Sequence, residues 1–357
     1  MKKALIAMSG GVDSSVAAYL MKENGYDIIG VTMKLFDNED IHETVEKTCC
    51  SLSDTEDARN VACMLGFPYY VFNFKADFKK QVIDRFIDAY EHCETPNPCI
   101  DCNRYLKFQE LYRRAKELGC DYVVTGHYAD IEKKNGRYFL KKAADPKKDQ
   151  SYVLYSLTQE QLAHTLFPLG KLEKSETRKI AEENGLLNAH KHDSQDICFV
   201  PDGDYASFIE KTTQRTYPEG DFVDTEGNVL GRHKGIIHYT IGQRKGLGLS
   251  LPAPLYVMDK DPENNQVILC TNEKLFKKEM DVMEINWITA DDFTEPFRAE
   301  VKIRYSHKAA PAVIIPDGNS AHVIFDEPQR AITPGQAAVF YDGAYVIGGG
   351  KIQGKIS

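Results

Sequence analysis

The 357-residue sequence predicts an α/β protein whose N-terminal half forms a parallel sheet covered by helices, followed by an all-β part. Apolar, strand-like runs alternate with amphipathic, helix-like segments up to about residue 200. A glycine-rich stretch directly follows the first of these runs. From about Gly203 the pattern changes to short apolar runs separated by turn residues, which is typical of a β module.

The predicted elements follow one another in a regular order. KKALIAM is an apolar run without polar alternation, which suits a strand buried on both faces. DIIGVTMKLF, PYYVFNF and DYVVTGHYA predict three more strands. Helical spacing of apolar residues predicts helices in SSVAAYLMKENG, SDTEDARNVACMLG, DFKKQVIDRFIDAY and LKFQELYRRAKELG. Strands that alternate with helices form parallel sheets, and ligands of such sheets bind beyond the carboxyl ends of the strands.

The stretch MSGGVDSS, Met8 to Ser15, lies between the first strand and the first helix and predicts an anion site. Gly10 and Gly11 let the backbone approach a ligand closely, and Ser14 offers a hydroxyl at the positive end of the helix. Asp13 has two interpretations, a helix cap or a magnesium ligand. The lysine of a Walker loop and the glycine spacing of a dinucleotide fold are both absent.

Two of the nine cysteines stand in a Cys99-x-x-Cys102 pair just before a predicted helix at 104–119. A helix start lowers the pKa of a thiol, so the position favours a reactive Cys102. Half of a zinc site, part of an iron–sulfur site and a redox dithiol all remain open, although no second ligand pair supports a closed zinc site. Cys198 follows the polar stretch HDSQDI, which favours an exposed, functional thiol over a buried one.

Charge and hydropathy exclude some classes of protein. The formal net charge of -9 argues against a protein that binds DNA regardless of sequence. RNA remains open because basic stretches occur at 141–148, 231–235 and 242–246, although solvated loops would look the same. No apolar run approaches the ~20 residues of a membrane span. We therefore expect a cytoplasmic protein without a membrane partner.

The spacing of SGGVDSS resembles the PP-loop of the ATP pyrophosphatase superfamily, which releases the β,γ-phosphates of ATP together as pyrophosphate. Further motifs follow in order along nearly the whole chain: GVTMKLF, NPCIDCN, TGHYA, KDQSYVLY, DSQDICF, YTIGQRKGLG, KIRYSH and TPGQAAVFY. This ordered set is similar to the bacterial tRNA-specific 2-thiouridylases, also called tRNA-uridine 2-sulfurtransferases.

The resemblance implies three domains. They are a PP-loop ATP pyrophosphatase catalytic domain at 1–202, a small central tRNA-binding domain at 203–278 and a C-terminal β-barrel-like domain at 279–357. An alternative interrupts the first domain by part of the central domain at about 163–190.

The resemblance also implies an activity. ATP adenylylates the C2 oxygen of wobble uridine 34 in the tRNAs for lysine, glutamate and glutamine, and persulfide sulfur displaces AMP to leave 2-thiouridine. The implied cofactors are ATP and Mg²⁺. The implied partners are tRNA and a persulfide donor, such as a cysteine desulfurase or a sulfur relay protein. A monomer is expected.

By motif match, Cys198 bears the persulfide and Cys102 is the nucleophile that frees its sulfur, which leaves a Cys102–Cys198 disulfide to be reduced. No metal ligand is expected. The match assigns nucleotide binding to Ala7, Met8, Ser9, Gly10, Gly11, Val12, Asp13, Ser14, Ser15, Met33 and Gly126. It assigns tRNA binding to Asn97, Pro98, Cys99, His127, Lys148, Asp149, Gln150, Arg304, Tyr305 and Gln336.

One position leaves alternatives open. Many relatives carry an aspartate where this chain has Cys99, and that aspartate is a candidate acid or base. A cysteine there leaves open the alternative of an iron–sulfur-dependent thiolase with Cys99, Cys102 and Cys198 as ligands. The sequence favours the persulfide mechanism over this alternative. Two further alternatives are a small-molecule ATP pyrophosphatase, which would not need paired cysteines, and a non-enzymatic RNA-binding or iron–sulfur sensor protein, which would not need the phosphate loop.

Overall fold

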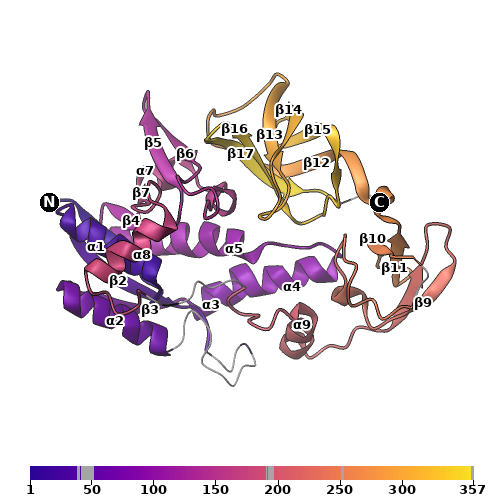
Figure 1. Cartoon of the computed structure of the whole chain (residues 1–357), viewed down its shortest axis with the longest axis horizontal. Coiled ribbons are helices and arrows are strands. Elements are labelled where there is room, and N and C mark those ends of the chain that lie inside the picture. The colour runs from indigo at the N-terminus through magenta and orange to yellow at the C-terminus, as the bar shows by residue number, and fades with distance from the viewer. Residues whose placement is uncertain (38–40, 42–51, 190, 192–196, 251–252, 355–357) are drawn as a thin grey trace. The chain divides into compact units, whose positions relative to one another are not determined.

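A computed structural model describes residues 1–37, 41, 52–189, 191, 197–250 and 253–354. The chain divides into two units (Figure 1). The first unit comprises 1–83, 98–203 and 343–347, and the second comprises 84–97, 204–342 and 348–357. Each unit is described separately.

The first unit is built on the predicted parallel sheet, in the order β3-β2-β1-β4-β7. Its strands are β1 (Lys3–Ala7), β2 (Asp27–Lys34), β3 (Tyr69–Asn73), β4 (Tyr122–Val124) and β7 (Thr165–Leu166). All of their pairings are parallel. Every residue from Ala4 to Ile6 is fully buried, because both faces of the sheet are covered.

One face of the sheet packs on α1 (Val12–Glu23), α2 (Leu52–Leu65) and α8 (Lys174–Glu183). Figure 1 shows α1 and α8 beside each other at this sheet. Val16, Ala17 and Met21 of α1 lie in this core, as the helical spacing predicts, whereas Leu20 is only partly buried. The helix runs back along the sheet, so the glycine-rich loop lies at the carboxyl end of β1.

The first unit also contains shorter helical segments and one hairpin, joined by irregular segments. α3 (Lys75–Phe78) continues into a π-helix, Lys79–Ile83. A single helical run comprises α5 (Pro98–Asp101), a π-helix at Cys102–Glu110 and α6 (Leu111–Glu117). The hairpin consists of β5 (Asp130–Lys134) and β6 (Arg137–Lys141), and α7 (Gln159–Ala163) follows it.

The described residues of the second unit form two β structures, the α-helices α4 (Asp84–Glu91) and α9 (Tyr205–Thr213), and two short 3-10 helices. A four-stranded sheet has the order β10-β11-β8-β9, from β8 (Gly220–Val223), β9 (Val229–His233), β10 (Tyr256–Asp261) and β11 (Gln266–Cys270). Phe222, Tyr239 and Val257 are at its core.

The last strands are β12 (Phe276–Trp287), β13 (Phe297–Lys302), β14 (Ala310–Asp317), β15 (Ser320–Arg330), β16 (Ala337–Asp342) and β17 (Tyr345–Ile352). They pair in the order β12-β15-β14-β13-β16-β17, and a further pairing of β12 with β17 closes them into a barrel. The predicted fold class, a parallel α/β domain followed by all-β parts that end in a barrel, is therefore confirmed.

Candidate active site

The predicted phosphate loop joins the end of β1 to the start of α1 and is held in shape by its own side chains. Gly10 has a φ of +70°, and a Cβ there would lie 2.3 Å from the carbonyl oxygen of Asp54. The Ser9 amide donates to Ser14 Oγ at 3.2 Å, and Ser14 Oγ donates to the Gly11 carbonyl at 3.0 Å. Gly11 is the N-cap and no side chain caps the helix, so the capping interpretation of Asp13 is wrong.

A cavity of about 360 Å³ opens beside this loop, entirely within the first unit. Its wall contains seven of the residues that the sequence assigns to the nucleotide: Ala7, Met8, Ser9, Asp13, Ser14, Met33 and Gly126. It also contains four that the sequence assigns to tRNA or the target base: Pro98, Cys99, His127 and Gln150. Gly10, Gly11, Val12 and Ser15 belong to the loop but not to the wall.

Gly126 follows β4 and lies against the start of α1. A Cβ at this position would come within 2.8 Å of the backbone of both Asp13 and Ser14. Such a contact does not occur between real atoms, so any other residue would push the phosphate loop away. The glycine therefore lets the segment after β4 approach the start of α1 closely.

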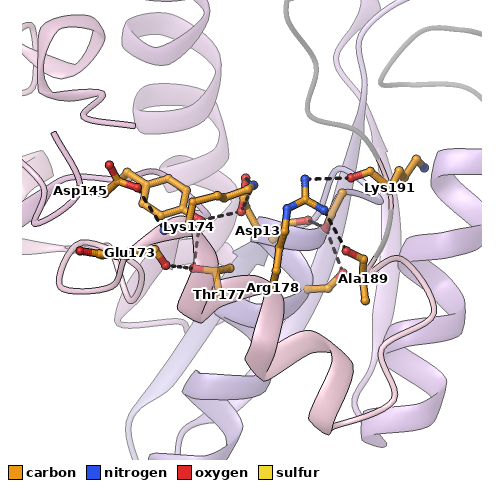
Figure 2. Close-up of polar contacts among 12 residues, drawn as sticks. Asp13, Asp145, Glu173, Lys174, Thr177, Arg178, Ala189 and Lys191 are labelled. Carbon is orange, nitrogen blue, oxygen red and sulfur yellow. Dashed lines mark hydrogen bonds and ion pairs between the residues drawn. The ribbon is translucent and has the colours of Figure 1, made fainter. Parts of the chain in front are cut away.

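Asp13 is the only acidic side chain among the described residues of the wall, and α8 holds it (Figure 2). Lys174 Nζ lies 2.6 Å from Asp13 Oδ1 and 2.8 Å from Oδ2. The Tyr128 hydroxyl donates to Oδ1 at 2.8 Å. Helix α8 begins at Lys174 because Glu173 and Glu176 form a capping box before it.

A second set of contacts holds the outer side of the loop. Asn188 Nδ2 donates to the Gly10 carbonyl at 3.1 Å and to Ser15 Oγ at 2.7 Å. Lys191 Nζ donates to the Gly10 carbonyl at 3.3 Å and pairs with Asp54 and Asp57. Burial opposes the charge on Lys191, but the hydrogen bonds that its ammonium donates to Asp54 and Asp57 outweigh burial and raise the lysine pKa.

Helix α8 supports that second set as well. Arg178 donates to the carbonyls of Ala189 and Lys191, at 3.0 and 3.4 Å (Figure 2). Sequence reasoning missed Lys174, Arg178, Asn188 and Lys191. They lie more than a hundred residues beyond the loop, and none belongs to a motif that marks a phosphate site.

The cysteines lie on the same wall, but their helix differs from the prediction. Pro98 starts the helical run, at the position where proline is favoured. Cys102 is therefore one turn inside the run, at the start of its π-helical part, and Cys99 is the cysteine in the first turn. The prediction that places Cys102 just before a helix beginning at Arg104 is wrong, because it overlooks this proline. Cys99 is exposed, and Cys102 and Cys198 are half-buried.

Cys198 is the third cysteine on the cavity wall, although it is distant in sequence from Cys99 and Cys102. It lines the cavity between Ile197 and Phe199, and Phe199 packs edge-on against Phe78 with ring centroids 5.7 Å apart. This aromatic contact holds the segment against the helix that ends in Phe78. The polar residues 192–196, on which the prediction of an exposed loop rests, lie outside the described residues.

His127 lies on the wall but is almost fully buried, between the rings of Phe108 and Phe167 at 6.0 and 5.9 Å. Burial, and next the charge of Lys107, hold the pKa of His127 well below 6.5, so the imidazole is neutral. Its Nδ1 lies 2.6 Å from Thr125 Oγ1 and its Nε2 lies 3.5 Å from Lys107 Nζ. Lys107 is a further wall residue that sequence reasoning missed.

The other predicted tRNA-binding residues of the first unit form hydrogen bonds within the protein. Asp149 accepts from the amides of Ala143 and Ser151 and from the Ser151 hydroxyl. Gln150 Oε1 accepts from the Tyr128 amide at 2.9 Å. The Lys148 amide donates to the Asp145 carbonyl at 3.2 Å.

The remaining predicted tRNA contacts lie in the second unit. Arg304 donates through Nη2 to the carbonyl of Ile241 at 3.0 Å, and also to Thr333. Gln336 Nε2 donates to the Thr95 carbonyl at 2.7 Å, two residues before Asn97. Tyr305 is 43% exposed, and the Lys302 ammonium lies over its ring, 5.3 Å from the centroid.

The described residues do not form a site for a protein-held metal. Within the described ranges, no three His, Cys, Asp or Glu side chains are gathered closely enough to bind one. The carboxylate of Asp13 is occupied by Lys174 and Tyr128. Across the same part of the chain, no helix is long and apolar enough to cross a membrane.

Comparison with known proteins matches three consecutive parts of the chain to family models. Family models match residues 2–202 as a tRNA methyl transferase HUP domain, 206–271 as a tRNA methyl transferase PRC-barrel domain and 277–352 as an aminomethyltransferase beta-barrel domain. The first is an ATP-binding type of domain. The tRNA-specific 2-thiouridylase MnmA of Clostridioides difficile is 56% identical over 99% of this chain and 98% of its own length. The chain belongs to the tRNA-specific 2-thiouridylase family.

Other members of this family are similarly close. The MnmA proteins of Clostridium kluyveri and Acetivibrio thermocellus are 53% and 52% identical over 98% and 99% of this chain, and over 99% of their own lengths. The domain descriptions mention methyl transfer, whereas the full-length relatives are thiouridylases. The relatives decide the activity because each one matches 98% or 99% of the chain, whereas each family model matches only a part of it. The resemblance drawn from the motifs is thus confirmed, and so is the class of enzyme, a sulfurtransferase.

Proposed function

We propose that this protein converts the wobble uridine 34 of the tRNAs for lysine, glutamate and glutamine to 2-thiouridine. One observation supports this most: Cys102 and Cys198 lie on the wall of the same cavity as the phosphate loop. A small-molecule ATP pyrophosphatase would need the loop but not two thiols beside it. A non-enzymatic RNA-binding protein would need neither.

The first step uses ATP. The C2 oxygen of the uracil bonds to the α-phosphorus, the bond to the bridging oxygen breaks with its electron pair on pyrophosphate, and the N3 proton is lost to solvent. The amides at Ser9–Ser15 and the positive end of α1 would hold the departing phosphates. Mg²⁺ would enter on the phosphates of ATP, since the described residues do not fit a protein-held ion.

The second step uses sulfur. The terminal sulfur of a Cys198 persulfide attacks C2, and the C2–O bond breaks with its electron pair on AMP. The Cys102 thiolate then attacks Cys198 Sγ, which forms the Cys102–Cys198 disulfide and leaves the sulfur on C2. An external thiol reductant must reopen the disulfide before the next turnover. We propose that a cysteine desulfurase or a sulfur relay protein loads the persulfide.

Further parts of the proposal concern the whole molecule. We propose the domains 1–202, 203–278 and 279–357, with the second and third serving tRNA recognition. Arg244 and Lys245 are exposed and available to RNA phosphates. We also propose a cytoplasmic monomer that meets tRNA and its sulfur donor there.

The test is mass spectrometry of tRNA after incubation with the protein, MgATP and a persulfide donor. Wild type should add one sulfur in place of oxygen. Cys198→Ser should form adenylylated tRNA but accept no sulfur, and Cys102→Ser should accept sulfur and then stall. Persulfide found on Cys102 would reverse the two roles, and full thiolation by Cys198→Ser would refute the mechanism.

An iron–sulfur-dependent route is the second candidate because Cys99 lies on the same wall. In this structure, however, the three described cysteines are not gathered closely enough to hold a metal, so this route would need them to move together. It predicts that activity follows bound iron and that Cys99→Ala is as damaging as either of the other substitutions. The persulfide route predicts that iron-free protein is active and that Cys99→Ala keeps a measurable rate. Anaerobic assays with and without reconstitution separate the two.

A further inference from the structure

The cavity wall has an unusual balance of charge. Among the described residues that line it, Lys107 is the only lysine or arginine and Asp13 the only acidic residue. Asp13 is already paired with Lys174, which lies outside the wall. Lys107 has no carboxylate partner among the described residues. The cavity therefore carries one uncompensated positive charge.

The π-helix explains how Lys107 reaches this wall. Cys102 and Lys107 are five residues apart, and in a regular α-helix that spacing would turn them ~140° away from each other. In the π-helix that spans Cys102–Glu110, the hydrogen bonds run from residue i to residue i+5. With about 4.4 residues per turn, residues five apart in a π-helix differ in direction by only ~50°, so both side chains can line the same cavity.

His127 keeps the lysine in place without neutralising it. The imidazole is neutral and its Nδ1 lies 2.6 Å from the Thr125 hydroxyl. With the proton on Nδ1 donated to Thr125, Nε2 is an acceptor for Lys107 Nζ at 3.5 Å. Burial between two aromatic rings maintains this state. One N–H of the ammonium is thus directed to His127, and the other two are available to a ligand.

We propose that Lys107 is a catalytic residue that donates to a non-bridging oxygen of the α-phosphate of ATP, and afterwards to the same phosphate of the departing AMP. The proposal rests on the thiolation chemistry proposed above. Both steps move negative charge onto this phosphate, first when the uracil oxygen bonds to phosphorus and then when the C2–O bond breaks. A fixed cation in a partly closed cavity stabilises such charge far better than water does.

A role for Lys107 at the α-phosphate explains why the phosphate loop itself lacks a lysine. A Walker lysine serves the β- and γ-phosphates, where a γ-phosphoryl group leaves. Here the bond that breaks is at the α-phosphorus. A cation is therefore needed farther along the nucleotide, on the side of the cavity where the cysteines and the target base lie. Lys107 lies on that side, on the same π-helix as Cys102.

The test compares Lys107→Met, Lys107→Arg and the matched control Lys116→Met. Lys116 belongs to the same helical run but is 56% exposed and pairs with Glu160 at 3.5 Å, away from the cavity. Single-turnover pyrophosphate release, with and without tRNA, gives the adenylylation rate. ATP affinity is measured separately, and urea midpoints verify that each variant is folded.

We expect Lys107→Met to slow tRNA-dependent pyrophosphate release by ~100-fold or more, with ATP affinity changed by less than about threefold. Lys107→Arg should recover part of the rate, and Lys116→Met should match wild type. A Lys107→Met rate equal to that of Lys116→Met would overturn the proposal. So would a loss seen only as a higher KM for ATP, or a folded Lys107→Arg no faster than Lys107→Met.

Pyrophosphate release by the wild-type protein distinguishes a failure of the proposed function from a failure of the proposed role of Lys107. If wild type releases no pyrophosphate in response to tRNA, the proposed function fails. The role of Lys107 is then tested with whichever acceptor does support release. If wild type responds to tRNA but Lys107→Met is unimpaired, only the inference about Lys107 fails.

Discussion

Replacing Lys174 by methionine removes the ammonium group from Asp13 and keeps most of the side-chain volume. The two side chains are 11% and 32% exposed, so this pair lies between a surface ion pair and a buried one. Exposed pairs contribute ~0–1 kcal/mol. Removing one partner of a fully buried pair costs ~3–5 kcal/mol. Because the Tyr128 hydroxyl still donates to Asp13, we expect a loss of about 2 kcal/mol in the free energy of unfolding.

The same substitution should also raise the KM for ATP. An unpaired Asp13 carboxylate on the cavity wall would repel the phosphates, so the KM for ATP should rise about tenfold, equivalent to ~1.4 kcal/mol. Urea unfolding gives the stability change, and pyrophosphate release at varied ATP gives the KM. The double variant Lys174→Met with Asp13→Asn should recover part of both losses, because it removes the uncompensated charge.

Lys179 on the same helix provides the control. It pairs with Glu183 at 3.7 Å, and both side chains are more than 60% exposed. Lys179→Met should cost under ~0.5 kcal/mol and leave the KM unchanged. Equal urea midpoints for Lys174→Met and Lys179→Met would refute the argument, since the pair with Asp13 would then behave as an ordinary surface contact.

Three further outcomes follow from the same structure. Gly126→Ala should weaken ATP binding at least tenfold by calorimetry and cost ~1–3 kcal/mol, because its Cβ would meet the backbone of Asp13 at 2.8 Å. Gly11→Ala, with its nearest contact at 3.5 Å, should leave the urea midpoint unchanged. Burial lowers the pKa of Lys260 below 10.5, so its charged form is penalised at neutral pH. Lys260→Met should therefore raise the free energy of unfolding at pH 7, by an amount on the order of 1 kcal/mol that shrinks toward pH 10.5; a loss would contradict this. The pKa of His127 lies well below 6.5, so stability should fall as pH drops from about 6.5 toward that value, and His127→Leu should reduce the dependence measured between pH 7 and pH 5.

The sequence alone was enough to predict the parallel sheet, the phosphate loop and two cysteines that the structure places on one cavity wall. These features are local: apolar runs without alternation predict buried strands, and glycines between a strand and a helix predict a close approach to an anion. The apolar stripe of α1 and the glycine-rich loop before Ser14 and Ser15 can both be recognised from neighbouring residues, without knowing which other segments they contact. The ordered motifs then led to the family, which the full-length relatives confirm.

Helix geometry beyond simple periodicity was harder to predict. Periodicity at 3.6 residues recovered the helix after Cys102 but misplaced its start, because it overlooked Pro98 as a first helical residue. It also could not reveal the π-helix, since one altered turn leaves little trace in the pattern of apolar residues. Lys107 therefore looked like an ordinary solvent-facing lysine.

Only the tertiary structure decided which charges the cavity has. Lys174 approaches Asp13, and Asn188 and Lys191 approach Gly10, because α8 packs against α1 on the same face of the sheet. Nothing in the sequence near the loop specifies these partners, since electrostatic contacts depend on distance in space and not along the chain. His127 and Lys107 are likewise separated in the chain, so the sequence could not show that a neutral imidazole contacts this lysine and leaves its charge uncompensated.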